Sequence, residues 1–73
     1  MTVKQALQCI IIVGSAGEPT LNYAVNYARA GLRMKGEELQ TQLLYIISNI
    51  SHWRGKLASE VREVLKRAAV GLD

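Results

Sequence analysis

The chain has 73 residues, of which 49% are hydrophobic, and nine Lys and Arg against six Asp and Glu give a net charge of +3. A single cysteine excludes an internal disulfide, and one histidine with one cysteine predicts neither a metal site nor a cofactor. The basic excess is ordinary for a small domain and favours an acidic partner only mildly.

The small size of the chain leaves a thin margin of stability. A domain of about 60 residues buries only about 60% of the surface that its unfolded form exposes. Without a disulfide or a metal, tight helical packing or self-association must supply the stability. The apolar segment Ala6–Val13 is short, is preceded only by Lys4 and contains Gln8, so no secretory signal is expected. It is also far below the roughly 20 apolar residues of a membrane span. We therefore expect one domain, residues 1–73, in the cytoplasm and not in a membrane.

The first predicted element is a helix over residues 3–13. Thr2 and Gln5 have the spacing of a capping box, in which two side chains satisfy free backbone groups at the start of a helix. Apolar residues then recur at helical spacing, and Gly14 is expected in the left-handed conformation that ends many helices. A strand at Cys9–Val13 is the alternative, because β-branched residues favour strands. A lone strand would have no partner elsewhere in the chain, so the helix is favoured.

A glycine-rich loop over residues 14–19 separates this helix from the next. Its spacing matches neither phosphate-binding glycine motif, so a plain turn is expected. The second helix is predicted to begin at Pro19 or Thr20, to run to Ala30 and to stop at Gly31. Its inward face has helical spacing and consists of Leu21, Ala24, Val25 and Ala28.

The third helix is expected after the connection at residues 32–35 and should end near Ser51 or His52. Glu37 and Glu38 fall in its first turn, where the helix dipole favours acidic side chains. Its apolar stripe is the broadest in the chain, which predicts the central helix of the fold. The stripe comprises Leu39, Leu43, Leu44, Ile46, Ile47 and Ile50.

The fourth helix is predicted over residues 56–69, and Val70–Asp73 is expected to fray. Its inward face consists of Leu57, Val61, Val64, Leu65 and Ala68. Four helices joined by short connections predict an all-α protein, a compact bundle of four short helices.

The most versatile chemical groups gather in the turn before the fourth helix, at His52, Trp53 and Arg54. Trp53 could stack against a ligand, but filling the corner between two helices is the favoured role. His52 has no second histidine and no neighbouring carboxylate, so neither catalysis nor metal binding is expected of it. Cys9 has no adjacent base or cation and is expected to be an inert hydrophobic residue. The chain is therefore not expected to be an enzyme.

Three apolar or aromatic residues suit self-association better than an isolated monomer. On a helical wheel, Ile12 falls beside two glutamines, and Tyr23 and Tyr27 lie away from the main face of their helix. Tyrosine is common at interfaces, where its ring is buried and its hydroxyl stays hydrogen-bonded. Burial against another helix of the same chain is the alternative. We expect a protein that acts through protein–protein contact, as a homodimer formed through Ile12, Tyr23 and Tyr27.

The alternative function is that of a nucleic-acid-binding regulator. Arg and Lys neutralise phosphates, and Asn and Arg recognise the edges of bases. No segment matches a helix-turn-helix strongly, and each cation can equally be a solvated surface residue. The candidate contacts are Asn22, Asn26, Arg29, Arg33, Arg54, Arg62 and Lys66.

Overall fold

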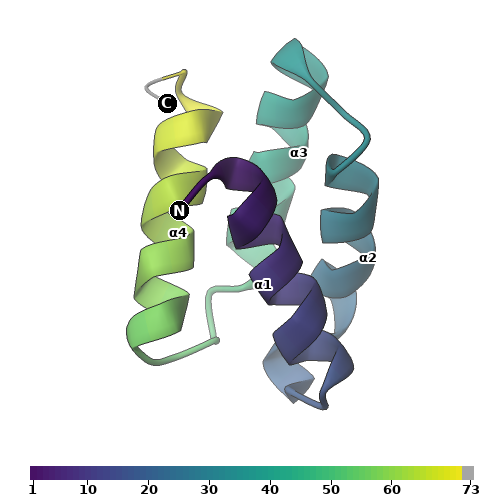
Figure 1. Cartoon of the computed structure of the whole chain (residues 1–73), viewed down its shortest axis with the longest axis vertical. Helices are drawn as coiled ribbons and strands as arrows, with labels where there is room; N and C mark the ends of the chain where they lie inside the picture. The colour runs from purple at the N-terminus through teal and green to yellow at the C-terminus, as the bar shows by residue number, and fades with distance from the viewer. Residues whose placement is uncertain (72–73) are drawn as a thin grey trace.

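Four α-helices run alternately up and down in the computed structural model of the chain, which describes residues 1–71 (Figure 1). A short 3-10 helix, η1, precedes the second of them. The elements are α1 (Val3–Ser15), η1 (Pro19–Leu21), α2 (Asn22–Gly31), α3 (Gly36–Asn49) and α4 (Lys56–Ala69). The prediction of an all-α bundle of four short helices is confirmed. The predicted fraying of Val70–Asp73 falls partly outside the described residues.

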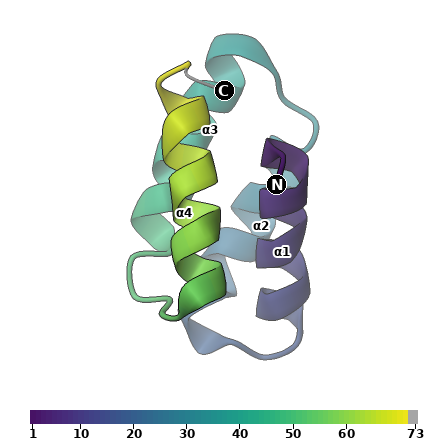
Figure 2. The same cartoon turned by 60° about the vertical axis from the view of Figure 1, so that its left-hand side comes forward.

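The helices form a closed ring around one core. Each helix packs against its neighbours in the chain, and α4 also packs against α1. Figure 2 shows α4 beside α3 on one side of the bundle and α1 beside α2 on the other. The radius of gyration of the Cα atoms is 10.7 Å, close to the roughly 11 Å expected for a folded domain of this length.

Local signals in the sequence position the start of α1 and the whole of α4 correctly. The Gln5 amide donates to Thr2 Oγ1 at 3.1 Å, and the Thr2 amide donates to Gln5 Oε1 at 2.8 Å, so the predicted capping box is present. The fourth helix has the predicted bounds, Lys56–Ala69. Cys9–Val13, the alternative strand, lies within α1.

The ends of the second and third helices differ from the prediction. Glu18 Oε2 accepts hydrogen bonds from the Thr20 amide and hydroxyl, which stabilises η1 as a separate turn before α2. At its other end, α2 includes Gly31. The third helix ends at Asn49, before Ser51 and His52. A tight turn follows, in which the Trp53 amide donates to the Ile50 carbonyl.

The core is aliphatic, apart from one tryptophan, and all four helices contribute to it. Among the described residues no polar or charged side chain is buried. The buried hydrophobic residues are Ala6, Leu7, Ile10, Leu21, Ala24, Ala28, Leu43, Ile46, Ile50, Trp53, Ala58, Val61, Leu65 and Ala68. Leu43 and Ile46 are therefore core residues, as predicted from the stripe of the third helix.

Two leucines that were predicted to face the core lie on the surface instead. Leu44 is 57% exposed and Leu57 is 39% exposed. Leu44 is two residues before the buried Ile46, about 200° around the helix, and so points away from the core. Leu57 is about 100° from the buried Ala58, which takes the core position in the first turn of α4.

The prediction that the first helix stops before a left-handed Gly14 is also wrong. The helix continues to Ser15, and the turn uses the positive φ of Gly17, +113°. Gly14 instead permits close packing. A Cβ atom at this position would lie 3.2 Å from Leu21 Cβ and would collide with Val25 Cγ2. The missing side chain is therefore what allows α1 and α2 to approach each other here.

Candidate functional site

Two tyrosines lie on the flank of α2 that borders α3. The Gln42 side-chain amide of α3 donates to the Tyr27 carbonyl oxygen at 3.0 Å, which places Tyr27 beside α3. Tyr23 is one helical turn earlier on the same flank. Val25, by contrast, packs beside Gly14 of α1. The tyrosines therefore belong to the boundary between α2 and α3, and Val25 belongs to the opposite flank.

A third tyrosine, Tyr45, borders the same boundary from α3. Tyr45 follows Gln42 by three residues, so the two share a flank of the helix. Because α2 and α3 are antiparallel, moving forward along α3 from Gln42 corresponds to moving back along α2 from Tyr27. At 1.5 Å per residue, Tyr45 lies about 4.5 Å along this direction and Tyr23 about 6 Å along it. The three residues therefore lie at similar levels along one boundary between α2 and α3.

We call this set, Tyr23, Tyr27 and Tyr45, the tyrosine seam. It contains every tyrosine of the chain, and the three residues are 77%, 42% and 58% exposed. Tyr45 was not among the residues predicted for self-association. Its position about 100° from Ile46 on the helical wheel, at the edge of the core stripe, is the signal that could have identified it.

Ile12 does not join the tyrosine seam. It is 67% exposed and lies two residues, or about 200°, from the buried Ile10, so it points outward from α1. The flank of α2 that meets α1 is that of Val25, not that of the tyrosines. The three residues predicted for self-association therefore do not form one surface.

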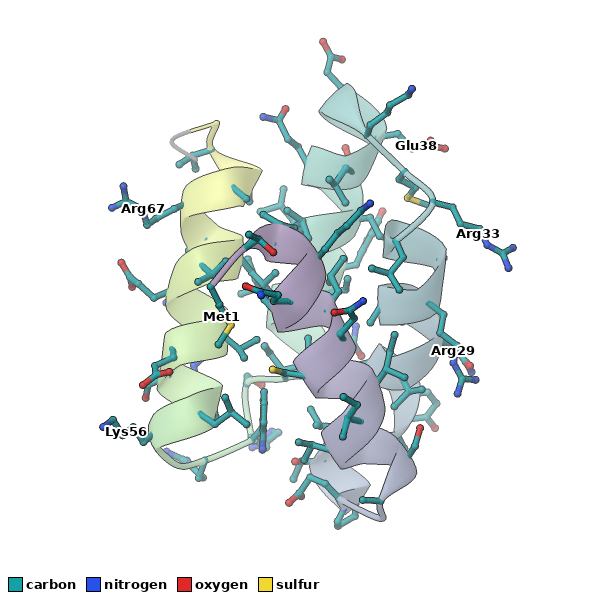
Figure 3. All side chains as sticks on the ribbon, in the orientation of Figure 1. Met1, Arg29, Arg33, Glu38, Lys56 and Arg67 are labelled. Atoms are coloured by element: carbon teal, nitrogen blue, oxygen red, sulfur yellow. The ribbon has the colours of Figure 1, made fainter. Side chains whose placement is uncertain are left out.

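Four residues predicted for nucleic-acid contact form a line along the outside of α2. Asn22, Asn26, Arg29 and Arg33 are exposed and follow one another at intervals of four, three and four residues, the spacing of a single helix face. Arg33 lies beyond the end of α2, where its amide donates to the Ala30 carbonyl and continues the helical turn. Figure 3 shows Arg29 and Arg33 projecting on the same side, away from the bundle.

The other three predicted nucleic-acid contacts, Arg54, Arg62 and Lys66, lie at the corner between α3 and α4 or on α4. Arg62 is half-buried, and its Nη1 donates to the Trp53 carbonyl oxygen at 2.7 Å and to the Ile50 carbonyl oxygen at 3.4 Å. The same corner holds the Trp53 ring, which is 5% exposed, as expected of a residue that fills the corner between two helices. Arg62 thus has a structural role at this corner. The seven residues predicted for nucleic-acid contact are divided between two separate surfaces.

His52 and Cys9, the remaining residues with reactive side chains, are not part of a larger group of such residues among residues 1–71. His52 is exposed, and Cys9 is a free thiol packed partly against the core. Within residues 1–71 there is no pocket and no group of three His, Cys, Asp or Glu side chains that could hold a metal ion. No helix in this part of the chain is both long enough and apolar enough to cross a bilayer.

Comparison of the chain with protein-family models, with curated proteins and with solved structures gives no match. Function is therefore inferred from two surfaces of the bundle, the tyrosine seam and the polar line along α2.

Proposed function

We propose that the protein acts through protein–protein contact and forms a homodimer through the tyrosine seam. The observation that carries this proposal is the exposure of all three tyrosines along one boundary between two helices. No catalytic role is proposed. The expected compartment is the cytoplasm, since a chain with one cysteine has no internal disulfide.

Tyrosine rings supply the kind of surface on which protein interfaces are built. Each aromatic side chain can bury about 150–250 Å², and tyrosine is enriched at the centre of interfaces because its hydroxyl can still find a hydrogen-bond partner. A standard interface takes about 800 Å² from each partner. That area is about one sixth of the 4733 Å² accessible surface of this chain, roughly one lateral face of a four-helix bundle.

A second copy of the chain is the partner that the small size favours. A bundle of 73 residues has a limited core, and association that involves only the folded state stabilises it by mass action. In a two-fold interface the same patch meets itself. Because Tyr45 lies between the levels of Tyr23 and Tyr27, a two-fold axis near Tyr45 would pair Tyr23 of one protomer with Tyr27 of the other.

The decisive experiment is sedimentation velocity over a series of protein concentrations. We expect the wild-type chain to dimerise and the double variant Tyr23→Glu with Tyr45→Glu to remain a monomer. Each new carboxylate would have to lose its hydration in the interface without a partner to compensate. Both residues are more than half exposed, so circular dichroism should show that the variant is still helical.

The matched control is Lys66→Ala with Arg67→Ala, two exposed residues of α4. This variant lowers the net charge by the same amount as the tyrosine variant but leaves the seam intact, so it should dimerise as the wild type does. Arg62 is avoided because it hydrogen-bonds the corner between α3 and α4. A wild-type monomer at the highest concentration, or a dimer that tolerates both glutamates, would overturn the proposal.

A further inference from the structure

The charges of the chain are segregated between its two halves. Residues 1–36 contain four cations, Lys4, Arg29, Arg33 and Lys35, and one acid, Glu18. Residues 37–73 contain five cations and five acids. The net charge of +3 is therefore carried entirely by the half that folds as α1 and α2.

The packing of α1 against α2 brings one more cation to the line along α2. A Cβ on Gly31 would lie 3.4 Å from Leu7 Cδ1, so the first turns of α1 are level with the end of α2. Lys4 is three residues before Leu7 and shares the flank of α1 that borders α2. It is exposed and lies at the end of the bundle where α2 is followed by Arg33.

These residues, Lys4, Asn22, Asn26, Arg29 and Arg33, are here called the basic face. All five are exposed. No acid occurs between Glu18 and Glu37, so α2 itself has no negative charge to oppose its arginine. Figure 3 places Arg29 and Arg33 on the opposite side of the bundle from Lys56 and Arg67. The basic face is therefore separate from the charges of α4.

We propose that the basic face binds double-stranded DNA. Arg and Lys would contact phosphate oxygens, for which the planar guanidinium is well suited. Asn22 and Asn26 lie on the same helix face as Arg29, and an asparagine amide can pair with adenine in the major groove. This surface differs from the tyrosine seam, so the inference does not depend on dimerisation.

Two observations favour duplex DNA over other nucleic acids. Proteins that hold single strands stack the bases on aromatic side chains. Of the four aromatic residues here, three lie on the tyrosine seam and Trp53 is buried. The basic face is carried mainly by one side of an α-helix, and a helix fits the B-form major groove, about 12 Å wide, but not the narrow major groove of A-form RNA.

The number of cations predicts the strength of the salt dependence. Each phosphate neutralised in B-DNA contributes a slope of about −0.9 to the plot of log affinity against log salt concentration. Lys4, Arg29 and Arg33 together predict a slope of about −2.7 for one chain. A single chain bound to the duplex should therefore lose about 40-fold in affinity between about 50 and 200 mM salt.

The test is fluorescence anisotropy of a short labelled duplex of mixed sequence, titrated with the full chain at several salt concentrations. Arg29→Ala with Arg33→Ala should reduce the slope to about −0.9 per chain and weaken binding more than about tenfold at low salt. The control, Lys66→Ala with Arg67→Ala, lowers the net charge equally on the balanced half of the molecule. It should bind within about twofold of the wild type.

Equal weakening in the two variants would overturn the proposal, because net charge and not the basic face would then govern binding. Tighter binding of a single strand, or of duplex RNA, would overturn the choice of duplex DNA. Tyr45→Glu alone is expected to be a monomer and places its new charge on α3, not on α2 beside the basic face, so this variant separates the two proposals. If the wild type dimerises, the salt slope per binding unit should be about half as steep in this variant, since half as many cations are joined.

Discussion

Arg62 Nη1 of α4 donates a hydrogen bond to the carbonyl oxygen of Trp53 across 2.7 Å, nine residues back along the chain. The same nitrogen lies 3.4 Å from the Ile50 carbonyl oxygen, just after the end of α3. The last carbonyls of a helix have no partner within the helix. A cation placed there satisfies them and interacts favourably with the helix dipole. A side chain from α4 thus holds both the end of α3 and the corner that contains Trp53.

The first prediction concerns this corner. Arg62→Ala should lower the free energy of unfolding by about 1–3 kcal/mol, the usual penalty for leaving partly buried acceptors without a donor. In a domain of this size each kcal/mol corresponds to a fall of roughly 4–8 °C in Tm. Thermal and urea unfolding, followed by circular dichroism, would measure the change. The control is Lys66→Ala, one helical turn after Arg62 on the exposed surface of α4. It should change the free energy of unfolding by less than about 0.5 kcal/mol.

Gly14→Ala tests the close packing of α1 against α2. Alanine is the better helix former by about 1 kcal/mol, so helix propensity alone predicts a more stable protein. The collision with Val25 and the tight approach to Leu21 predict the opposite, a loss of about 1–3 kcal/mol from overpacking. Urea unfolding decides between the two. A more stable Gly14→Ala variant would contradict the role assigned to this glycine.

A second substitution can locate the clash caused by an alanine at position 14. Val25→Ala should be destabilising in the wild-type background, because it removes packed methyl groups. Combined with Gly14→Ala it should cost less than the sum of the two single changes, since the smaller side chain makes room for the new Cβ. Ser15→Ala, on the exposed surface of the same helix, is the control and should be nearly neutral.

Two adjacent leucines of α3 provide a matched comparison of core and surface. Leu43 is 0% exposed and Leu44 is 57% exposed. Leu43→Ala should cost about 2–5 kcal/mol, which can abolish folding in a marginally stable domain. Leu44→Ala should stay within about 0.5 kcal/mol of the wild type. Equal losses in the two variants would show that the core side of α3 is assigned incorrectly.

The capping box at the start of α1 gives a fourth prediction. Thr2→Ala removes the acceptor of the Gln5 amide and should cost about 1 kcal/mol. Because the two side chains act reciprocally, Thr2→Ala and Gln5→Ala together should cost less than the sum of the single changes. A double-mutant cycle of thermal unfolding experiments would measure the coupling. Strict additivity would contradict the reciprocal arrangement.

Features that depend only on nearby residues were predictable from the sequence. The bounds of the fourth helix and the capping box at Thr2 follow from spacing within a few turns. The buried positions Leu43 and Ile46 follow in the same way, because they lie at the centre of a wide apolar stripe. Such local patterns specify where a helix starts and which of its faces is buried.

Features that depend on a neighbouring helix were not predictable. The edge of an apolar stripe is covered or exposed according to which helix packs beside it, and therefore Leu44 and Leu57 were assigned to the core wrongly. Gly14 has the sequence signature of a helix end, and only the approach of Val25 reveals its role in packing. The tyrosine seam joins two helices. The helical wheel alone places Tyr45 at the edge of the stripe of α3, and only the packing of α3 beside α2 brings it to the flank that carries Tyr23 and Tyr27.

The closed ring of antiparallel helices also has a consequence for the rate of folding. Most of its helix pairs are neighbours in the chain, and proteins rich in such local contacts fold within microseconds to milliseconds. Within residues 1–71, the contact between α1 and α4 joins the first helix to the last, and closing this long loop costs more entropy than closing the others. We therefore expect this contact to form after the transition state. Val64 packs partly against the core and lies about 200° around α4 from Arg62, on the flank away from α3 and therefore towards α1. If the contact between α1 and α4 forms late, Val64→Ala should accelerate unfolding and leave the folding rate almost unchanged. Stopped-flow measurements of both rates would test this.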